Sequence, residues 1–285
     1  MNKKIVVSLV ICLCLLAACA SLDSGGNILS PSEPDAPPES EYEKPVYQFE
    51  KSYLADRQYY ANDDSGMELA HYTYQLDAIS LSNPEQVSPE DAEAAQRNIE
   101  AFNNKMSALL DDLTEYGQAI GDDATTLYIQ ESAIFTSGGF YDETASACCQ
   151  AGYVVSVRLD TRSYAGGAHP NYYTSSYLFD LRTGQFIDAT QLAEDPEAFR
   201  SGVAELLIER ADAIEDNRDG YWPDYTDTIS RWNEGAVLFD EEGMLVVYSP
   251  YDIGPYAMGM VELHLSYDEL AEVIGPAGAE HLGIG

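Results

Sequence analysis

Two adjacent glycines and a nearby proline interrupt a pair of strand-like runs in the middle of the chain. The interruption contains Tyr164 and the sequence GGAHPN at residues 166–171, and the strand-like runs lie at residues 153–161 and 172–180. Glycine reaches backbone angles that are closed to other residues, and proline fixes its own φ and lacks an N–H donor. The stretch therefore predicts a shaped, rigid turn at the edge of a sheet, longer than a minimal hairpin turn.

A second restricted loop lies far downstream, in the sequence YDIGPYAMG at residues 251–259. Before it, residues 236–240 and 244–249 form a predicted hairpin with a turn at residues 241–243. After it, a strand is predicted at residues 260–265 and a short helix at residues 267–274. Both loops combine restricted backbone with tyrosines, and we expect them to lie close together in space.

These motifs resemble a known bacterial extracytoplasmic domain. GGAHPN, then YLFDLRTGQFIDATQL, then YDIGPYAMG ahead of a strand and a short helix, is similar to the C-terminal domain of RsiV-type anti-sigma factors, which also occurs in PdaC-type peptidoglycan deacetylases. The resemblance covers roughly residues 45–275. It implies an α+β fold with antiparallel sheets and a few packed helices. For RsiV-type members it also implies lysozyme binding at the cell surface.

The resemblance implies two consecutive small α+β domains. The expected division is an N-terminal companion domain at residues 46–145, the RsiV-like domain at residues 146–275 and a tail at residues 276–285. Within the first, Ser88, Pro89 and two following acids predict a helix that begins at Pro89 and ends at Gly117. A strand is predicted at residues 125–136, and His71 is expected on the polar face of another strand.

The N-terminus predicts a lipoprotein leader at residues 1–19. Lys3 and Lys4 precede an apolar run that is too short for a comfortable membrane span, and the run ends in Leu-Ala-Ala before Cys19. Cys19 would carry the acyl chains, and two chains anchor a protein stably where one does not. An ordinary secretory signal is the alternative. Residues 20–45 are rich in Ser, Pro, Glu and Gly and predict a disordered tether.

Charge constrains the partner more than any other compositional feature. The chain has 49 acidic and 14 basic residues and a net charge of −35. Removing the leader with its two lysines takes the net charge to −37. Such a chain repels a phosphate backbone, which excludes nucleic acid, and it favours cationic partners. The alternative is a surface that is acidic for solubility alone. The 21 tyrosines suit half-buried strands, protein interfaces and sugar stacking.

Catalytic motifs are sparse. The sequence has four histidines, no Gly-x-Ser-x-Gly elbow, no glycine-rich phosphate loop and no His-Glu-x-x-His. A carboxylate pair of the glycosidase type is not testable from a sequence with 49 acids. No PdaC-type deacetylase domain follows these residues, so we expect no enzymatic activity, no cofactor and no metal. Cys148 and Cys149 could form a strained vicinal disulfide, pair between chains or remain thiols.

His169 has two interpretations, a ligand or general base in a tyrosine-lined cleft, or a residue that ties its loop through hydrogen bonds to backbone. The second is favoured for a histidine before proline in a glycine turn.

The sequence therefore predicts a lipid-anchored, extracytoplasmic binding protein. Its partner would be a basic enzyme such as lysozyme, inhibited by occlusion of the active site, or alternatively peptidoglycan; a structural envelope role is the third option. The anchor would hold it on the outer face of the plasma membrane, or on the outer membrane of a two-membrane cell. The lipoprotein leader replaces the cytoplasmic segment and membrane helix of RsiV-type members, so sigma-factor control is not expected. The expected contact residues are Tyr164, Gly166, Gly167, His169, Pro170, Tyr251, Gly254, Pro255 and Tyr256.

Overall fold

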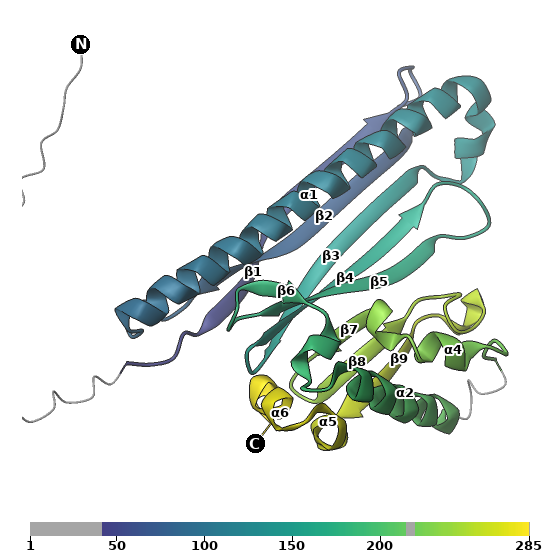
Figure 1. The fold of residues 1–285 in the computed structure, drawn as a ribbon. Coiled ribbons are helices and arrows are strands. Elements are labelled where there is room, and N and C mark those ends of the chain that lie inside the picture. The colour runs from purple at the N-terminus through teal and green to yellow at the C-terminus, as the bar shows by residue number, and fades with distance from the viewer. Residues whose placement is uncertain (1–41, 215–219, 285) are drawn as a thin grey trace, which may run out of the picture. The chain divides into compact units, whose positions relative to one another are not determined.

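A computed structural model describes residues 42–214 and 220–284 of the 285-residue chain (Figure 1). The fold is α+β, as predicted, and residues Tyr42–Gly285 form one compact unit. The predicted leader, with Cys19, and residues 20–41 of the predicted tether lie outside the described residues. Within the described residues, no helix is both long enough and apolar enough to cross a membrane.

The larger of the two sheets contains six strands in the order β1-β2-β3-β4-β5-β6. Its strands are β1 Tyr47–Tyr60, β2 Glu68–Leu81, β3 Phe140–Ala151, β4 Val154–Tyr164, β5 Asn171–Asp180 and β6 Gln185–Ile187. All neighbouring strands are antiparallel except β2 and β3, which pair in parallel from Ala70 with Phe140 to Gln75 with Ala145. A parallel pair needs a long crossover connection, and helix α1 supplies it.

Helix α1, Pro89–Glu131, runs along one face of this sheet and is 43 residues long (Figure 1). The predicted start is confirmed, because Ser88 Oγ accepts a hydrogen bond from the backbone N–H of Asp91. The predicted end at Gly117 is wrong, and so is the predicted strand at residues 125–136. The helix continues to Glu131 and is followed by a 3₁₀ helix at Ser132–Ser137.

Gly117 is present because the helix lies close to the sheet, and it does not end the helix. A Cβ atom at this position would lie 2.5 Å from Tyr72 Cδ1 and 2.6 Å from the Tyr74 hydroxyl. That hydroxyl donates a 2.7 Å hydrogen bond to Asp142, whose side chain is buried on β3. Burial raises the pKa of Asp142, partly offset by the hydrogen bond from Tyr74.

Nearer the N-terminal end of the helix, an apolar core fills the space between α1 and the sheet. Phe102 and Met106 of α1 are fully buried against Val157 and Phe179 of the central strands. The rings of Phe102 and Phe179 meet edge to face, with their centroids 5.5 Å apart. This arrangement is the favoured geometry of an aromatic pair.

The smaller sheet packs on the opposite side of β4 and β5 and contains β7 Ala236–Phe239, β8 Gly243–Tyr248 and β9 Val261–Ser266 (Figure 1). Two backbone N–H groups of β7 join the sheets, one from Val237 to Ser176 Oγ at 2.8 Å and one from Phe239 to Ser156 Oγ at 2.7 Å. The predicted hairpin, the following strand and helix α5, Tyr267–Ile274, are all confirmed.

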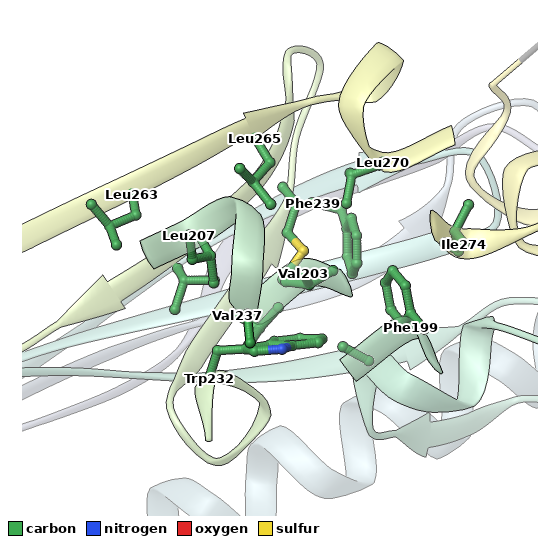
Figure 2. Packing of buried hydrophobic residues seen from close by; sticks show 14 of the residues in the cluster. Phe199, Val203, Leu207, Trp232, Val237, Phe239, Leu263, Leu265, Leu270 and Ile274 are labelled. Atoms are coloured by element: carbon green, nitrogen blue, oxygen red, sulfur yellow. The ribbon is translucent and has the colours of Figure 1, made fainter. Parts of the chain in front are cut away.

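Helices complete the second core, which Figure 2 shows from close by. They are α2 Pro196–Ala213, α4 Tyr225–Ile229, α5, and α6 Pro276–Leu282, with 3₁₀ turns at Ala189–Leu192 and Trp232–Glu234. Phe199 of α2 meets the buried Trp232 edge to face at 5.7 Å. The expectation of a tail at residues 276–285 was wrong for most of its length, because α6 packs on this core through Leu282.

The folded region begins earlier in the chain than expected, and the expected boundary between two domains lies within a strand. Glu43 and Lys44 already hydrogen-bond to the segment that precedes α1, so the last residues assigned to the tether join the fold. The expected boundary between residues 145 and 146 falls inside β3, whose neighbours β2 and β4 lie on either side of it in the sequence. Cys148 and Cys149 are both thiols.

Candidate binding site

The two Gly/Pro loops lie against each other, as expected from the sequence. We call residues 164–170 and 251–259 together the loop pair. The Tyr256 hydroxyl donates a 2.8 Å hydrogen bond to the carbonyl oxygen of Pro170. The Tyr256 ring also stacks on His169, with centroids 3.8 Å apart and planes inclined by 22°. One tyrosine thus joins segments that are 86 residues apart in sequence.

His169 uses both ring nitrogens within the loop pair. Its Nδ1 lies 2.9 Å from the Pro170 carbonyl oxygen, and a carbonyl only accepts, so Nδ1 carries the proton. In the neutral ring Nε2 then accepts from the Tyr251 hydroxyl at 3.2 Å. These contacts agree with the interpretation favoured from the sequence, in which His169 holds its loop through hydrogen bonds and is neither a ligand nor a general base.

The first loop depends on glycine at its tip. Gly167 has φ +107°, a left-handed conformation that L side chains rarely adopt. Its carbonyl oxygen accepts a 3.1 Å hydrogen bond from the Tyr164 hydroxyl, which closes the loop on itself. Tyr164 is therefore half-buried and occupied in shaping the loop.

The second loop holds Tyr251 in an unusual conformation. Tyr251 has φ +79°, the one positive φ of a non-glycine residue in the part of the chain that the structure describes. Its N–H donates to the Gly254 carbonyl at 3.1 Å, and its own carbonyl accepts from Trp222 Nε1 at 3.3 Å. Burial raises the pKa of the neighbouring Asp252, which accepts a hydrogen bond from the Ser249 N–H. A strained, cross-braced residue of this kind is often part of a functional surface.

The predicted contact residues differ in how much of each reaches solvent. Tyr251 is 53% exposed, whereas Tyr164, His169, Pro170, Pro255 and Tyr256 are half-buried and Gly254 is buried. A Cβ atom at Gly254 would lie 2.7 Å from Met258 Sδ, so this glycine permits close packing. Tyr251 is therefore the side chain of the loop pair that is best placed to reach a partner.

A row of flat side chains continues from the loop pair across the sheet. His71 of β2 stacks on Tyr141 of β3, with centroids 5.7 Å apart. The Arg162 guanidinium of β4 lies 4.9 Å from the Tyr141 centroid and 5.8 Å from that of Tyr172 on β5. Tyr172 in turn lies 6.4 Å from Tyr256, centroid to centroid. We call His71, Tyr141, Arg162 and Tyr172 the planar row.

The planar row was not predicted as a site from the sequence. Each member occupies the polar face of an alternating strand, and His71 was expected to be an ordinary surface residue. Instead its ring nitrogens lie 2.7 Å from Glu68 and 3.2 Å from Glu143. The available signal was an aromatic residue at one polar-face position in each of β3 and β5. Without the strand pairing these positions could not be aligned.

Two solved structures have a similar fold. One is a crystal structure of a DUF3298 family member from Bacteroides fragilis, at 19% identity and TM-score 0.60, covering 84% of this chain and 98% of that chain. The other is a DUF3298 family protein from Pseudomonas aeruginosa, at 14% identity and TM-score 0.51, covering 82% and 96%. At this identity the likeness concerns the fold alone.

The sequence comparisons match less of the chain than the structure comparisons do. No curated protein matches the chain. Residues 195–268 match the family described as "Protein of unknown function (DUF3298)", a span that runs from the cap of α2 to the start of α5 and includes the second loop of the loop pair.

Proposed function

We propose that this protein is a lipid-anchored protein of the bacterial cell envelope that binds a basic protein partner of the lysozyme type through its loop pair. The partner class comes from the resemblance of the loop motifs to RsiV-type extracytoplasmic domains. The anchor is Cys19, at the end of the leader-like segment. The protein acts by binding, and inhibition follows when the loops occupy the partner's active-site cleft.

The observation that carries this proposal is the bracing of the loop pair around an exposed tyrosine. Tyr256, His169 and Pro170 join the two loops, and Tyr251 remains 53% exposed beside them. A preformed loop loses little conformational entropy on docking, and tyrosine supplies a large contact area with few rotatable bonds. Such a surface suits insertion into a concave partner.

Charge supports a cationic partner. The net charge of −35 creates a negative potential that raises the rate of encounter with a basic protein and falls with ionic strength. The engagement of both His169 ring nitrogens within the loop pair supports binding over base catalysis at this site.

The test measures the affinity of the protein, without its leader, for hen egg-white lysozyme by isothermal titration calorimetry at low and high salt. Tyr251→Ala should weaken binding at least about tenfold, as expected for a central aromatic contact. Its melting temperature should fall less than that of Tyr256→Ala, because Tyr251 is 53% exposed and its hydrogen bond to His169 is exposed to solvent. Tyr116→Ala, at a tyrosine of α1 that is 55% exposed, is the matched control and should bind normally.

Tyr256→Ala provides the complementary measurement. Because its hydroxyl and ring hold Pro170 and His169, this variant should lose stability and affinity together. A wild-type protein without salt-sensitive affinity for lysozyme would overturn the partner assignment. Normal binding by Tyr251→Ala would overturn the loop pair as the site.

The second candidate is a cell-wall glycan as the partner. The planar row favours it, because flat side chains in line across a sheet suit the faces of sugar rings. Sedimentation with purified peptidoglycan, alongside the lysozyme titration, separates the two candidates.

A further inference from the structure

Part of the large sheet's outer face is left open by the second sheet. The second sheet covers β4 and β5 near Ser156 and Ser176, where β7 donates its backbone N–H groups. Beyond that contact, Gln75 of β2, Ala145 of β3 and Asp160 of β4 are exposed. They belong to the face opposite α1, since the alternate positions Tyr74 and Thr144 are buried.

This open face is hollowed into a groove of about 310 Å³. The groove is lined by Thr73, Gln75, Glu143, Ala145, Asp160 and Arg162. Two of its sides are polar side chains from β2 and β4, and the small side chain of Ala145 lies between them in the sheet. The groove lies beside the planar row, because Arg162 belongs to both.

We infer that the groove and the planar row form a binding site for an uncharged oligosaccharide of pyranose rings. The apolar face of a sugar ring packs on a flat, electron-rich surface, and Tyr172, which is 37% exposed, supplies one beside the groove. The equatorial hydroxyls of such a ring need donors and acceptors at its edge. Amide, hydroxyl, guanidinium and carboxylate groups in the groove supply both.

The hydrogen-bonding groups include two that are not used elsewhere in the described part of the chain. The side chains of Thr73 and Gln75 make no hydrogen bond there, although both line the groove. Glu143 and Asp160, by contrast, are fixed by neighbours. Glu143 lies 3.2 Å from His71 Nε2, and Asp160 accepts from Thr174 Oγ1 at 2.7 Å and from Arg158 Nε at 2.9 Å. The site thus combines two carboxylates that are fixed in place with two polar side chains that are available to hydrogen-bond a ligand.

Charge argues against other occupants. The carboxylates of Glu143 and Asp160 disfavour an anion, and the cationic Arg162 beside them disfavours a simple cation. The groove side chains are polar apart from Ala145, so an apolar helix or tail gains little by burial there. A neutral, hydroxyl-rich ligand meets both restrictions.

The planar row is also preorganised. Arg162 is held between the rings of Tyr141 and Tyr172, and His71 is held against Tyr141. Side chains that are already ordered lose less rotational freedom when a ligand binds. The site rests on the glycan candidate of the proposed function, which it deepens, and not on the lysozyme proposal, since its groove residues lie outside the loop pair.

The test titrates chitohexaose and cellohexaose, two neutral hexasaccharides, into the protein without its leader by isothermal titration calorimetry. We expect saturable binding of at least one of them. Tyr172→Ala and Gln75→Ala should each weaken that binding about tenfold, and Tyr116→Ala should not change it. Gln75→Ala should not destabilise the protein, because the Gln75 side chain is exposed and makes no hydrogen bond within the described residues. A loss of binding in this variant would therefore not result from unfolding.

Two outcomes would overturn the inference, and two others separate it from the lysozyme proposal. Absence of binding for both hexasaccharides at millimolar concentration overturns the inference. So does binding that survives in both Tyr172→Ala and Gln75→Ala. If Gln75→Ala no longer binds the hexasaccharide but still binds lysozyme, the two binding sites are separate. If the wild-type protein binds the hexasaccharide but not lysozyme, the lysozyme proposal fails and this inference stands.

Discussion

Gly117→Ala offers a sharp test of how α1 lies on the sheet. In an exposed helix interior this substitution raises stability by about 1 kcal/mol, because alanine loses less backbone entropy than glycine. Here the added methyl would lie 2.5 Å from the Tyr72 ring and 2.6 Å from the Tyr74 hydroxyl. Tyr72 is 5% exposed and Tyr74 is fully buried, so neither ring can move into solvent.

The magnitude follows from three contributions. Overpacking of a core costs about 1–3 kcal/mol. Displacing the Tyr74 hydroxyl removes the donor to buried Asp142, and a buried polar group without a partner costs about 1–3 kcal/mol more. After subtracting the propensity gain of about 1 kcal/mol, the net loss is about 3 kcal/mol at the middle of these ranges.

Thermal unfolding by calorimetry measures the loss. For a domain of this size, about 3 kcal/mol lowers the melting temperature by about 6–12 °C. Asn104→Ala, at an exposed position of the same helix, is the control and should leave the melting temperature equal or slightly higher. A Gly117→Ala protein that melts at or above the wild-type temperature would refute the close contact of α1 with Tyr72 and Tyr74.

Three further predictions concern other parts of the chain. Because burial holds the pKa of Asp142 above its unfolded value, its ionisation destabilises the fold as pH rises through the folded pKa. Asp142→Asn should therefore raise the melting temperature at pH 7 and change it little below about pH 3, where the carboxyl is mostly protonated in both states; an equal effect at both pH values would contradict this. Ser88→Ala should lower the free energy of unfolding by about 1 kcal/mol through loss of the α1 cap, and chemical denaturation measures it, with Ser88→Asp as the conservative variant that should retain the cap. Cys19→Ala should release the protein into the soluble fraction or leave it unprocessed, whereas unchanged processing and membrane association in fractionated cells would argue against the lipid anchor.

Elements with local signals were predictable from the sequence. The hairpin of β7 and β8 follows from two short apolar runs on either side of a glycine turn, and helix α5 follows from acidic residues in its first turn after a serine cap. The length of α1 was not, since Gly117 carries the same local signal whether it ends a helix or admits a neighbouring ring. Only the position of Tyr72 and Tyr74, on a strand more than 40 residues earlier, distinguishes the two.

The two candidate sites differ in predictability for the same physical reason. The loop pair is marked by glycine and proline, whose backbone restrictions act within one or two residues. Its two segments and their proximity were therefore predicted, and the fold was needed only for the atoms through which they contact each other. The groove depends on a parallel pairing, Thr73 with Glu143 and Gln75 with Ala145, across the 43-residue crossover helix. Parallel register has no turn to set it, and a shift of one residue would place Tyr141 and Glu143 beneath α1 instead. The burial of Tyr74 and Asp142 under α1 is what fixes this register, and with it the polar groups that face the groove.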